Sequence, residues 1–264
     1  MSDTPPQADD ELAGTEQPFV SHLLELRDRL VRAMAAIGVC AAILDIYPGP
    51  SELYDLLAAP LVAHLPVGAT LIATSVISPF MVPLKILLMA AFLLALPVVL
   101  YQVWAFIAPG LYAHEKRLVM PLVVSSTVLF FIGVAFCYFF VFGQVFKFIQ
   151  SFAPKSITAA PDIEAYLSFV LSMFLAFGLA FEVPIAVVVL ARMGVVSIQK
   201  LKDFRGYFVV LAFVIAAIVT PPDVVSQLAL AIPMCLLYEI GIWAAQVFIK
   251  HTQAPTEPPA TPSA

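Results

Sequence analysis

Long apolar stretches separated by short polar segments dominate this chain of 264 residues. A helix that crosses a membrane needs about 20 mainly apolar residues, because it rises about 1.5 Å per residue through a hydrocarbon core about 30 Å thick. The stretches that approach or reach this length are residues 30–47, 80–101, 118–142, 165–191, 207–220 and 224–248. The pattern therefore predicts an all-α integral membrane protein with six transmembrane helices.

The connections between these spans differ in kind. Gly206 and Pro221 frame only about 14 residues, or about 21 Å of helix, so the fifth span either crosses a thinned bilayer or forms a buried half-span. The loop at 48–79 is rich in proline, and its leucines follow helical spacing, which favours an amphipathic helix on the membrane surface. The loop at 220–223 is so short that the last two spans form a tight hairpin.

Composition supports a single membrane domain. The chain is 62% hydrophobic and 12% charged, whereas soluble domains are about half apolar and a quarter charged. We expect an acidic, disordered leader at 1–18, a membrane domain at 19–249 and a disordered tail at 250–264. The three cysteines lie inside apolar stretches without metal or redox spacing, and are read as small buried hydrophobic residues.

Basic residues indicate the orientation of the chain. Ten lie before span one, in the loops 2–3 and 4–5, and after span six, while at most three lie on the other side. Cytoplasmic loops carry the excess of lysine and arginine. Both termini are therefore predicted to be cytoplasmic.

Glu182 is the most informative residue of the pattern. It lies inside the apolar stretch from Ala165 to Leu190, where a charged side chain costs about 2.5–3.5 kcal/mol on insertion scales. Pro184, two residues later, removes a helical hydrogen bond and favours a kink. The alternatives are an acid that works in a wet cavity and a structural acid that is protonated or bonded to another helix.

Two further acids lie at the cytoplasmic ends of spans. Glu25 is one helical turn from Arg29, and Asp28 one turn from Arg32, which is the favourable order for ion pairs. Glu115 lies in a charged cluster behind an aromatic-rich segment. Each is either an ordinary solvated charge or a carboxylate that receives a cation, and a guanidinium would be held by two hydrogen bonds.

The last span carries three polar positions. Asp223 can cap its N-terminus, where the helix dipole favours negative charge. Gln227, one turn further, needs a polar partner on another helix when it faces lipid. Glu239 lies nearer the inner end of the span, and its role is as open as that of Glu182.

Several function classes lack support in the sequence. The four histidines are scattered without metal spacing, no nucleotide or nucleophile motif is present, and no polybasic tract indicates nucleic acid. These observations leave no case for an ATPase, a dehydrogenase or a hydrolase, and we expect no metal and no cofactor. A carrier that uses Glu182 and a scaffold whose acids only cap and pair stay open at this point, although the lack of an internal repeat counts against the carrier.

Five strings in order resemble one family. They are Ser21–Arg27, Tyr101–Leu111, His114–Arg117, Ser168–Leu171 with Phe177–Pro184, and Thr220–Gln227 with Ala231–Met234. Together they resemble TatC, the six-span core of the twin-arginine protein translocase, over residues 19–249. The resemblance implies a concave, glove-like helical fold in the inner membrane and no enzymatic activity. It also implies a receptor that binds twin-arginine signal peptides of folded cargo and supports transport of that cargo driven by proton-motive force. The partners that it implies are the single-span subunits TatA and TatB, membrane lipid and further copies of the chain.

The resemblance also implies roles for individual residues. Glu25 and Glu115 match the two signal-binding acids, and Arg27, Phe106 and Pro60 match further positions on which the family relies. Glu182 matches the intramembrane acid of the family, and Asp223 matches the acid of its last outer loop. Thr220 and Gln227 match part of the polar patch that receives the partner subunits. Asp28 departs from the family, where many relatives carry a basic residue.

Overall fold

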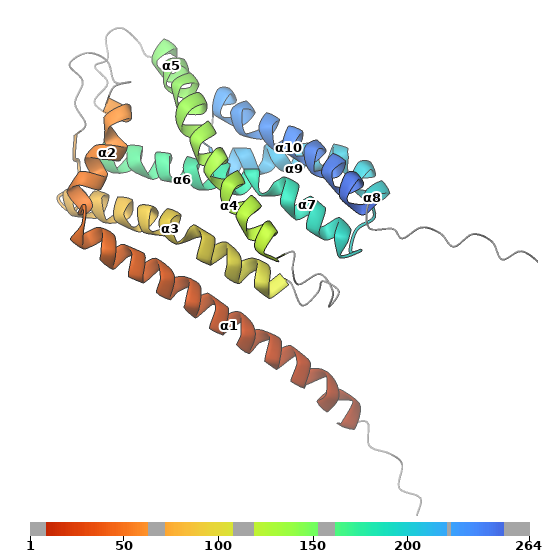
Figure 1. Cartoon of the computed structure of the whole chain (residues 1–264). Coiled ribbons are helices and arrows are strands. Elements are labelled where there is room, and N and C mark those ends of the chain that lie inside the picture. Colours follow the sequence, from red (N-terminus) through yellow and green to blue (C-terminus); the bar gives the residue numbers. More distant parts are fainter. Residues whose placement is uncertain (1–8, 63–71, 108–118, 153–161, 221–222, 251–264) are drawn as a thin grey trace, which may run out of the picture. The chain divides into compact units, whose positions relative to one another are not determined.

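The computed structural model describes residues 9–62, 72–107, 119–152, 162–220 and 223–250, and it is helical nearly throughout these segments (Figure 1). The long helices are α1 (Asp9–Ile46), α3 (Ser78–Ile107), α4 (Val119–Phe136), α6 (Ile163–Phe181), α9 (Arg205–Val219) and α10 (Val224–Lys250). The shorter ones are α2 (Pro50–Val62), the π-helical turn η3 (Cys137–Val141), α5 (Phe142–Phe152), α7 (Val183–Arg192) and α8 (Ile198–Asp203).

The predicted spans correspond to these helices. Four helical stretches are long and apolar enough to cross a membrane, namely Ser78–Ile107, Val119–Val145, Ile163–Arg192 and Val224–Val247. The first predicted span corresponds to His22–Ile46, which reaches the required apolar length only together with Pro50–Leu56, and the two parts are bent by 91°. The short fifth span is α9, whose 15 residues extend about 22 Å. The all-α membrane fold is thus confirmed.

Two boundaries differ from the sequence prediction. The helix α1 begins at Asp9, inside the segment 1–18 that was expected to be a disordered leader. The third span ends at Val145, close to the predicted residue 142, but the helical chain continues beyond it through η3 and α5 to Phe152. Residues 1–8 and 251–264 lie outside the described segments.

The described chain falls into two compact units. The first comprises residues 1–59 and 77–124, and in it α1 packs along α3 (Figure 1). The side of α3 that is buried includes Ile86, Ala91 and Ala95, none of them more than 1% exposed. Small residues in such a row allow two helix backbones to approach closely in a membrane.

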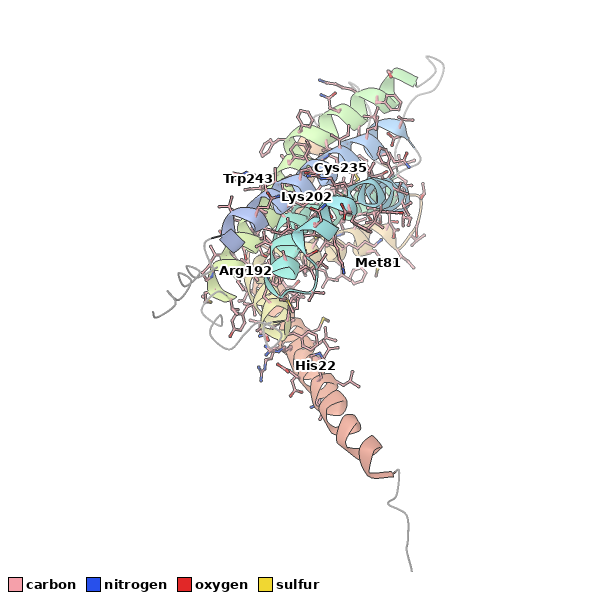
Figure 2. The ribbon with its side chains drawn as sticks, turned by 90° about the vertical axis from the view of Figure 1, so that its right-hand side faces the viewer. His22, Met81, Arg192, Lys202, Cys235 and Trp243 are labelled. Carbon is pink, nitrogen blue, oxygen red and sulfur yellow. The ribbon has the colours of Figure 1, made fainter. Side chains whose placement is uncertain are left out.

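The second unit comprises residues 60–76 and 125–264. There α10 packs against α7 and α9. The backbones of α7 and α10 approach so closely that a Cβ atom on Gly241 would lie 2.9 Å from the Cα atom of Pro184. The outward side of α10 is apolar, as Trp243 illustrates with 68% of its surface exposed (Figure 2). Such side chains suit a lipid environment.

Candidate functional site

The middle of α1 carries the first candidate group. Glu25 and Arg29 lie one turn apart, and the Nε and Nη2 atoms of Arg29 donate to Oε1 of Glu25 at 3.0 Å and 2.6 Å. The carboxylate side chain is 36% exposed and the guanidinium side chain 20% exposed. The helical spacing that the sequence indicated therefore brings these two charges together.

Asp28 pairs differently from the sequence prediction. Its Oδ1 accepts hydrogen bonds from Nε and Nη2 of Arg27, at 3.0 Å and 2.8 Å, rather than facing Arg32. Both side chains are more than half exposed. The additional negative charge beside Glu25 is thus balanced by Arg27, its neighbour in the sequence.

An aromatic contact links α3 to this part of α1. The rings of His22 and Phe106 stack with centroids 4.4 Å apart and an interplanar angle of 19°. His22 (Figure 2) precedes Glu25 by three residues and so lies on the same side of α1. Phe106 at the end of α3 is therefore held close to the acidic position of α1.

Two other predicted positions, Glu115 and the side chain of Pro60, lie outside the part of the chain that the structure describes. Glu115 lies in residues 108–118, outside the described part of the chain. Pro60 lies within α2, and its side chain is outside the described set. The structure thus brings together Glu25 and Phe106, while the second signal-binding acid of the family pattern has no described geometry.

Glu182 occupies a break between two helices. The helix α6 ends at Phe181 and α7 begins at Val183, with Pro184 in its first turn, as the proline led us to expect. Both carboxyl oxygens are buried, and Ser126 of α4 is the group that faces them. Among the described residues neither oxygen has a hydrogen bond of ordinary geometry. A buried carboxyl group without such a bond is energetically unfavourable inside a membrane, unless another polar group pairs with it.

Glu239 has a definite partner. Its Oε1 lies 2.7 Å from Nε of Arg205, and its Oε2 accepts from Nη2 of Arg205 at 2.8 Å. This two-bond fork is the strongest geometry for an ion pair between these groups. The next residue, Tyr238, donates its hydroxyl to the carbonyl of Leu201 at 2.9 Å. These bonds fix the C-terminal half of α10 to the start of α9 and to α8. They give Glu239 a structural role.

The outer hairpin contains the remaining candidates. Asp223 caps α10, because its Oδ1 accepts the Ser226 N–H at 2.7 Å. Thr220 ends α9, is buried, and donates its hydroxyl to the carbonyl of Ala216 at 2.8 Å. Gln227 is half-buried one turn into α10.

Sequence reasoning did not find several of these contacts. It did not single out His22 as a stacking partner, Ser126 beside Glu182, or Arg205 opposite Glu239. Only Arg205 had a usable signal, since a lone arginine and a lone glutamate at the inner ends of adjacent antiparallel spans are candidates for pairing. Among the described residues no three His, Cys, Asp or Glu side chains gather closely enough to hold a metal ion.

Comparison with known proteins gives one consistent result. The family model described as Sec-independent protein translocase protein (TatC) matches residues 21–233. Relatives described as Sec-independent protein translocase protein TatC include one from Halothiobacillus neapolitanus, 52% identical over 88% of this chain and 63% of its own length. Another, from Escherichia coli K12, is 49% identical over 88% of this chain and 90% of its own length.

Solved structures agree with the sequence relatives. A crystal structure of the twin arginine translocase receptor TatC matches with a TM-score of 0.74 and 41% identity, over 86% of this chain and 98% of the other. A second structure of that receptor, in DDM, matches with a TM-score of 0.74 and 40% identity, over 85% of this chain and 99% of the other. The expected fold is therefore matched by proteins of experimentally known structure.

Proposed function

Because this chain belongs to the TatC family of Sec-independent protein translocase proteins, we propose that it is the signal-peptide receptor of a twin-arginine translocase. The solved structures that it resembles are of a twin arginine translocase receptor. In this proposal Glu25 and Glu115 hold the two guanidinium groups of the signal peptide, each through charge-assisted hydrogen bonds. The protein binds cargo and carries out no chemical reaction on it.

The observation that carries the proposal is the partly exposed carboxylate of Glu25 beside a stacked aromatic pair. A guanidinium bound to the carboxylate could lie next to the ring of Phe106, and an apolar residue that follows the arginines would meet the apolar side chains of α1. Leu26 and Leu30 are 43% and 60% exposed on that helix. Arg27, which balances Asp28, keeps the surrounding charge from becoming more negative.

The orientation of the chain follows from its charges. The order of spans in the sequence assigns the basic residues at the end of α7 and in α8, including Arg192 and Lys202, to the same predicted side as the arginines of α1. The positive-inside rule places that side in the cytoplasm of the inner membrane. A receptor for newly made, folded cargo requires its binding acids on this side, so topology and proposed function agree.

The partners proposed for transport are the single-span subunits TatA and TatB, together with membrane lipid and further copies of this chain. The outer hairpin with Thr220 and Gln227 would bind a partner helix. Asp223 and Pro60 would have structural roles on the outer side of the membrane. Glu182, whose buried carboxyl lacks a well-formed hydrogen bond, would be completed by a polar group of a partner or a signal helix. Proton-motive force drives passage of the cargo.

The test replaces each acid by its uncharged isostere. Glu25→Gln and Glu115→Gln should each reduce photo-crosslinking of a twin-arginine signal peptide at least tenfold, because a buried or half-buried charged hydrogen bond is worth about 1.5–3 kcal/mol. Asp28→Asn is the matched control, since it removes an exposed acid three residues from Glu25 and should leave crosslinking within twofold of the original protein. Crosslinking that stays at the level of the original protein in both single variants and in their double variant would rule out the receptor proposal. Export assays on the same strains show whether binding and transport fall together.

A further inference from the structure

Arg29 occupies the carboxylate that the proposed function assigns to a signal peptide. Two of its nitrogen atoms converge on the single oxygen Oε1 of Glu25, at 3.0 Å and 2.6 Å. The guanidinium is only 20% exposed, so it is more deeply placed than the carboxylate that it holds. The resting state of this site therefore contains an arginine already, supplied by the chain itself.

A second guanidinium cannot form its best contact while Arg29 stays in place. The two-bond fork between arginine and a carboxylate uses both oxygens, one for each N–H donor. Oε1 of Glu25 is engaged twice by Arg29, which leaves only Oε2 for a newcomer. An incoming arginine that is to be held by the fork must first displace Arg29.

We propose that Arg29 is an internal competitor that lowers the affinity of the receptor for twin-arginine signal peptides. The inference rests on the proposed role of Glu25 as a signal-binding acid. When only a fraction of a receptor is in its binding-competent state, the apparent affinity falls by that fraction. An ion pair one turn apart on a helix is of modest strength, so Arg29 sets a threshold and does not block the site.

The neighbouring charges make Arg29 the relevant competitor in the described part of α1. Arg27 is already committed to Asp28 through two hydrogen bonds, and Arg32 lies seven residues from Glu25, about two turns away. His22 is stacked on Phe106. Arg29 is the basic side chain that the structure joins to the Glu25 carboxylate.

A structural role for Arg29 predicts the opposite sign. If its hydrogen bonds serve to orient Glu25 toward the peptide, removal of the guanidinium would loosen the carboxylate and weaken binding. If Arg29 competes, the same removal strengthens binding. The direction of the change therefore separates a competitor from a positioning residue.

The experiment measures equilibrium binding of a fluorescent peptide to the full chain in lipid nanodiscs. The probe carries an Arg-Arg pair followed by an apolar segment. Arg29→Gln should raise its affinity about two- to sixfold, the range expected when a helix-surface ion pair no longer competes. Arg29→Lys, which keeps the charge but loses the paired N–H donors of the guanidinium, should give a smaller gain. Arg32→Gln removes an equal charge from the same helix and should change the affinity less than twofold.

Each outcome bears on the proposal. A gain in Arg29→Gln that exceeds the change in Arg32→Gln supports competition. Unchanged or reduced affinity in Arg29→Gln, or an equal gain in both variants, overturns it. Glu25→Gln, alone and combined with Arg29→Gln, tests the underlying function. If Glu25→Gln reduces binding but Arg29→Gln does not raise it, only the competitor role fails; if Glu25→Gln leaves binding intact, the proposed function fails as well.

Discussion

Asp162 shows how one residue can join distant parts of the chain. Its Oδ1 accepts the N–H groups of Glu164 and Ala165 at 3.0 Å and 2.9 Å, which caps the start of α6. Its Oδ2 accepts the hydroxyl of Thr74 at 2.6 Å and the Thr74 N–H at 3.1 Å. The residue before α6 is thus tied to the segment before α3, 88 positions earlier.

These bonds make the tie sensitive to acid. The hydroxyl of Thr74 and then the N–H of Ala165 stabilise the charged carboxylate, and lower the pKa of Asp162 from 3.8 to about 2. A lowered pKa means that the group stabilises the fold above the pKa of the unfolded chain, and that this contribution is lost as pH falls through the folded value. We therefore expect the stability gap between the original protein and Asp162→Asn to be constant above about pH 5 and to close between about pH 4 and 2. Thermal unfolding in detergent at pH 6, 4, 3 and 2 measures the gap; a gap that widens on acidification would contradict the assignment.

Contacts within one helix could be predicted at the residue scale, and contacts between loops could not. The pair of Glu25 and Arg29 follows from the four-residue spacing of any helix. The same rule misplaced Asp28, because its carboxylate bonds to the adjacent Arg27 and not to Arg32, one turn away. The tie between Asp162 and Thr74 has no periodic signal, since both lie outside the helices and only the folded chain brings them together.

At the scale of elements, α4 and α6 are held together by two glycines. A Cβ atom on Gly133 would lie 2.5 Å from the carbonyl oxygen of Phe177, and one on Gly178 would lie 2.3 Å from the ring of Phe130. Phe130 and Phe177 are at most 1% exposed, so neither ring has room to withdraw. Small residues are the means by which membrane helices pack closely, because lipid supplies little hydrophobic force between helices.

Gly178→Ala should therefore destabilise the protein. Overpacking costs about 1–3 kcal/mol, which exceeds the gain of up to about 1 kcal/mol from replacing a helical glycine by alanine. Gly143→Ala is the matched control, because no atom lies within 4 Å of the position that its Cβ would take. Unfolding in mixed detergent should show a loss for Gly178→Ala and no loss for Gly143→Ala. Equal stability of the two variants would show that α4 and α6 separate at little cost.

The sequence predicted which elements exist better than how they end. Apolar length identified the spans, and Pro184 identified the break at Glu182, because each acts locally. The π-helical turn at Cys137–Val141 and the continuation to Phe152 were missed, because an apolar stretch has the same composition in either helical form. The start of α1 at Asp9 was missed because an acidic, proline-containing segment is typical of disorder as well as of a helix start.

At the scale of the whole molecule, a short fifth span leaves the outer hairpin in an unusual position. The helix α9 extends about 22 Å, which is less than a hydrocarbon core of about 30 Å. We therefore expect the hairpin between α9 and α10 to lie at a depth that longer spans cross as apolar helix. Thr220 donates its hydroxyl to its own helix, and Asp223 uses Oδ1 for the cap of α10. Oδ2 of Asp223 and Oγ of Ser226 are buried and have no hydrogen-bond partner among the described residues. Gln227, half-buried one turn into α10, adds donors and an acceptor to this polar group, and we expect it to bind a polar group on a partner helix.

Gln227→Leu should therefore weaken assembly with the single-span partners while preserving the fold. Leucine keeps the size of the side chain and removes its donors and acceptor. A hydrogen bond between membrane helices contributes about 0.6–2 kcal/mol, so the association constant should fall about three- to thirtyfold. Val224→Leu is the control, because Val224 lies three residues earlier on α10, is 65% exposed, and stays apolar on substitution. Co-purification of TatA- and TatB-like subunits at matched expression measures the effect. Recovery of partners that is equal for the two variants would place their docking surface away from this hairpin, and would leave Gln227 as a polar side chain satisfied within its own chain.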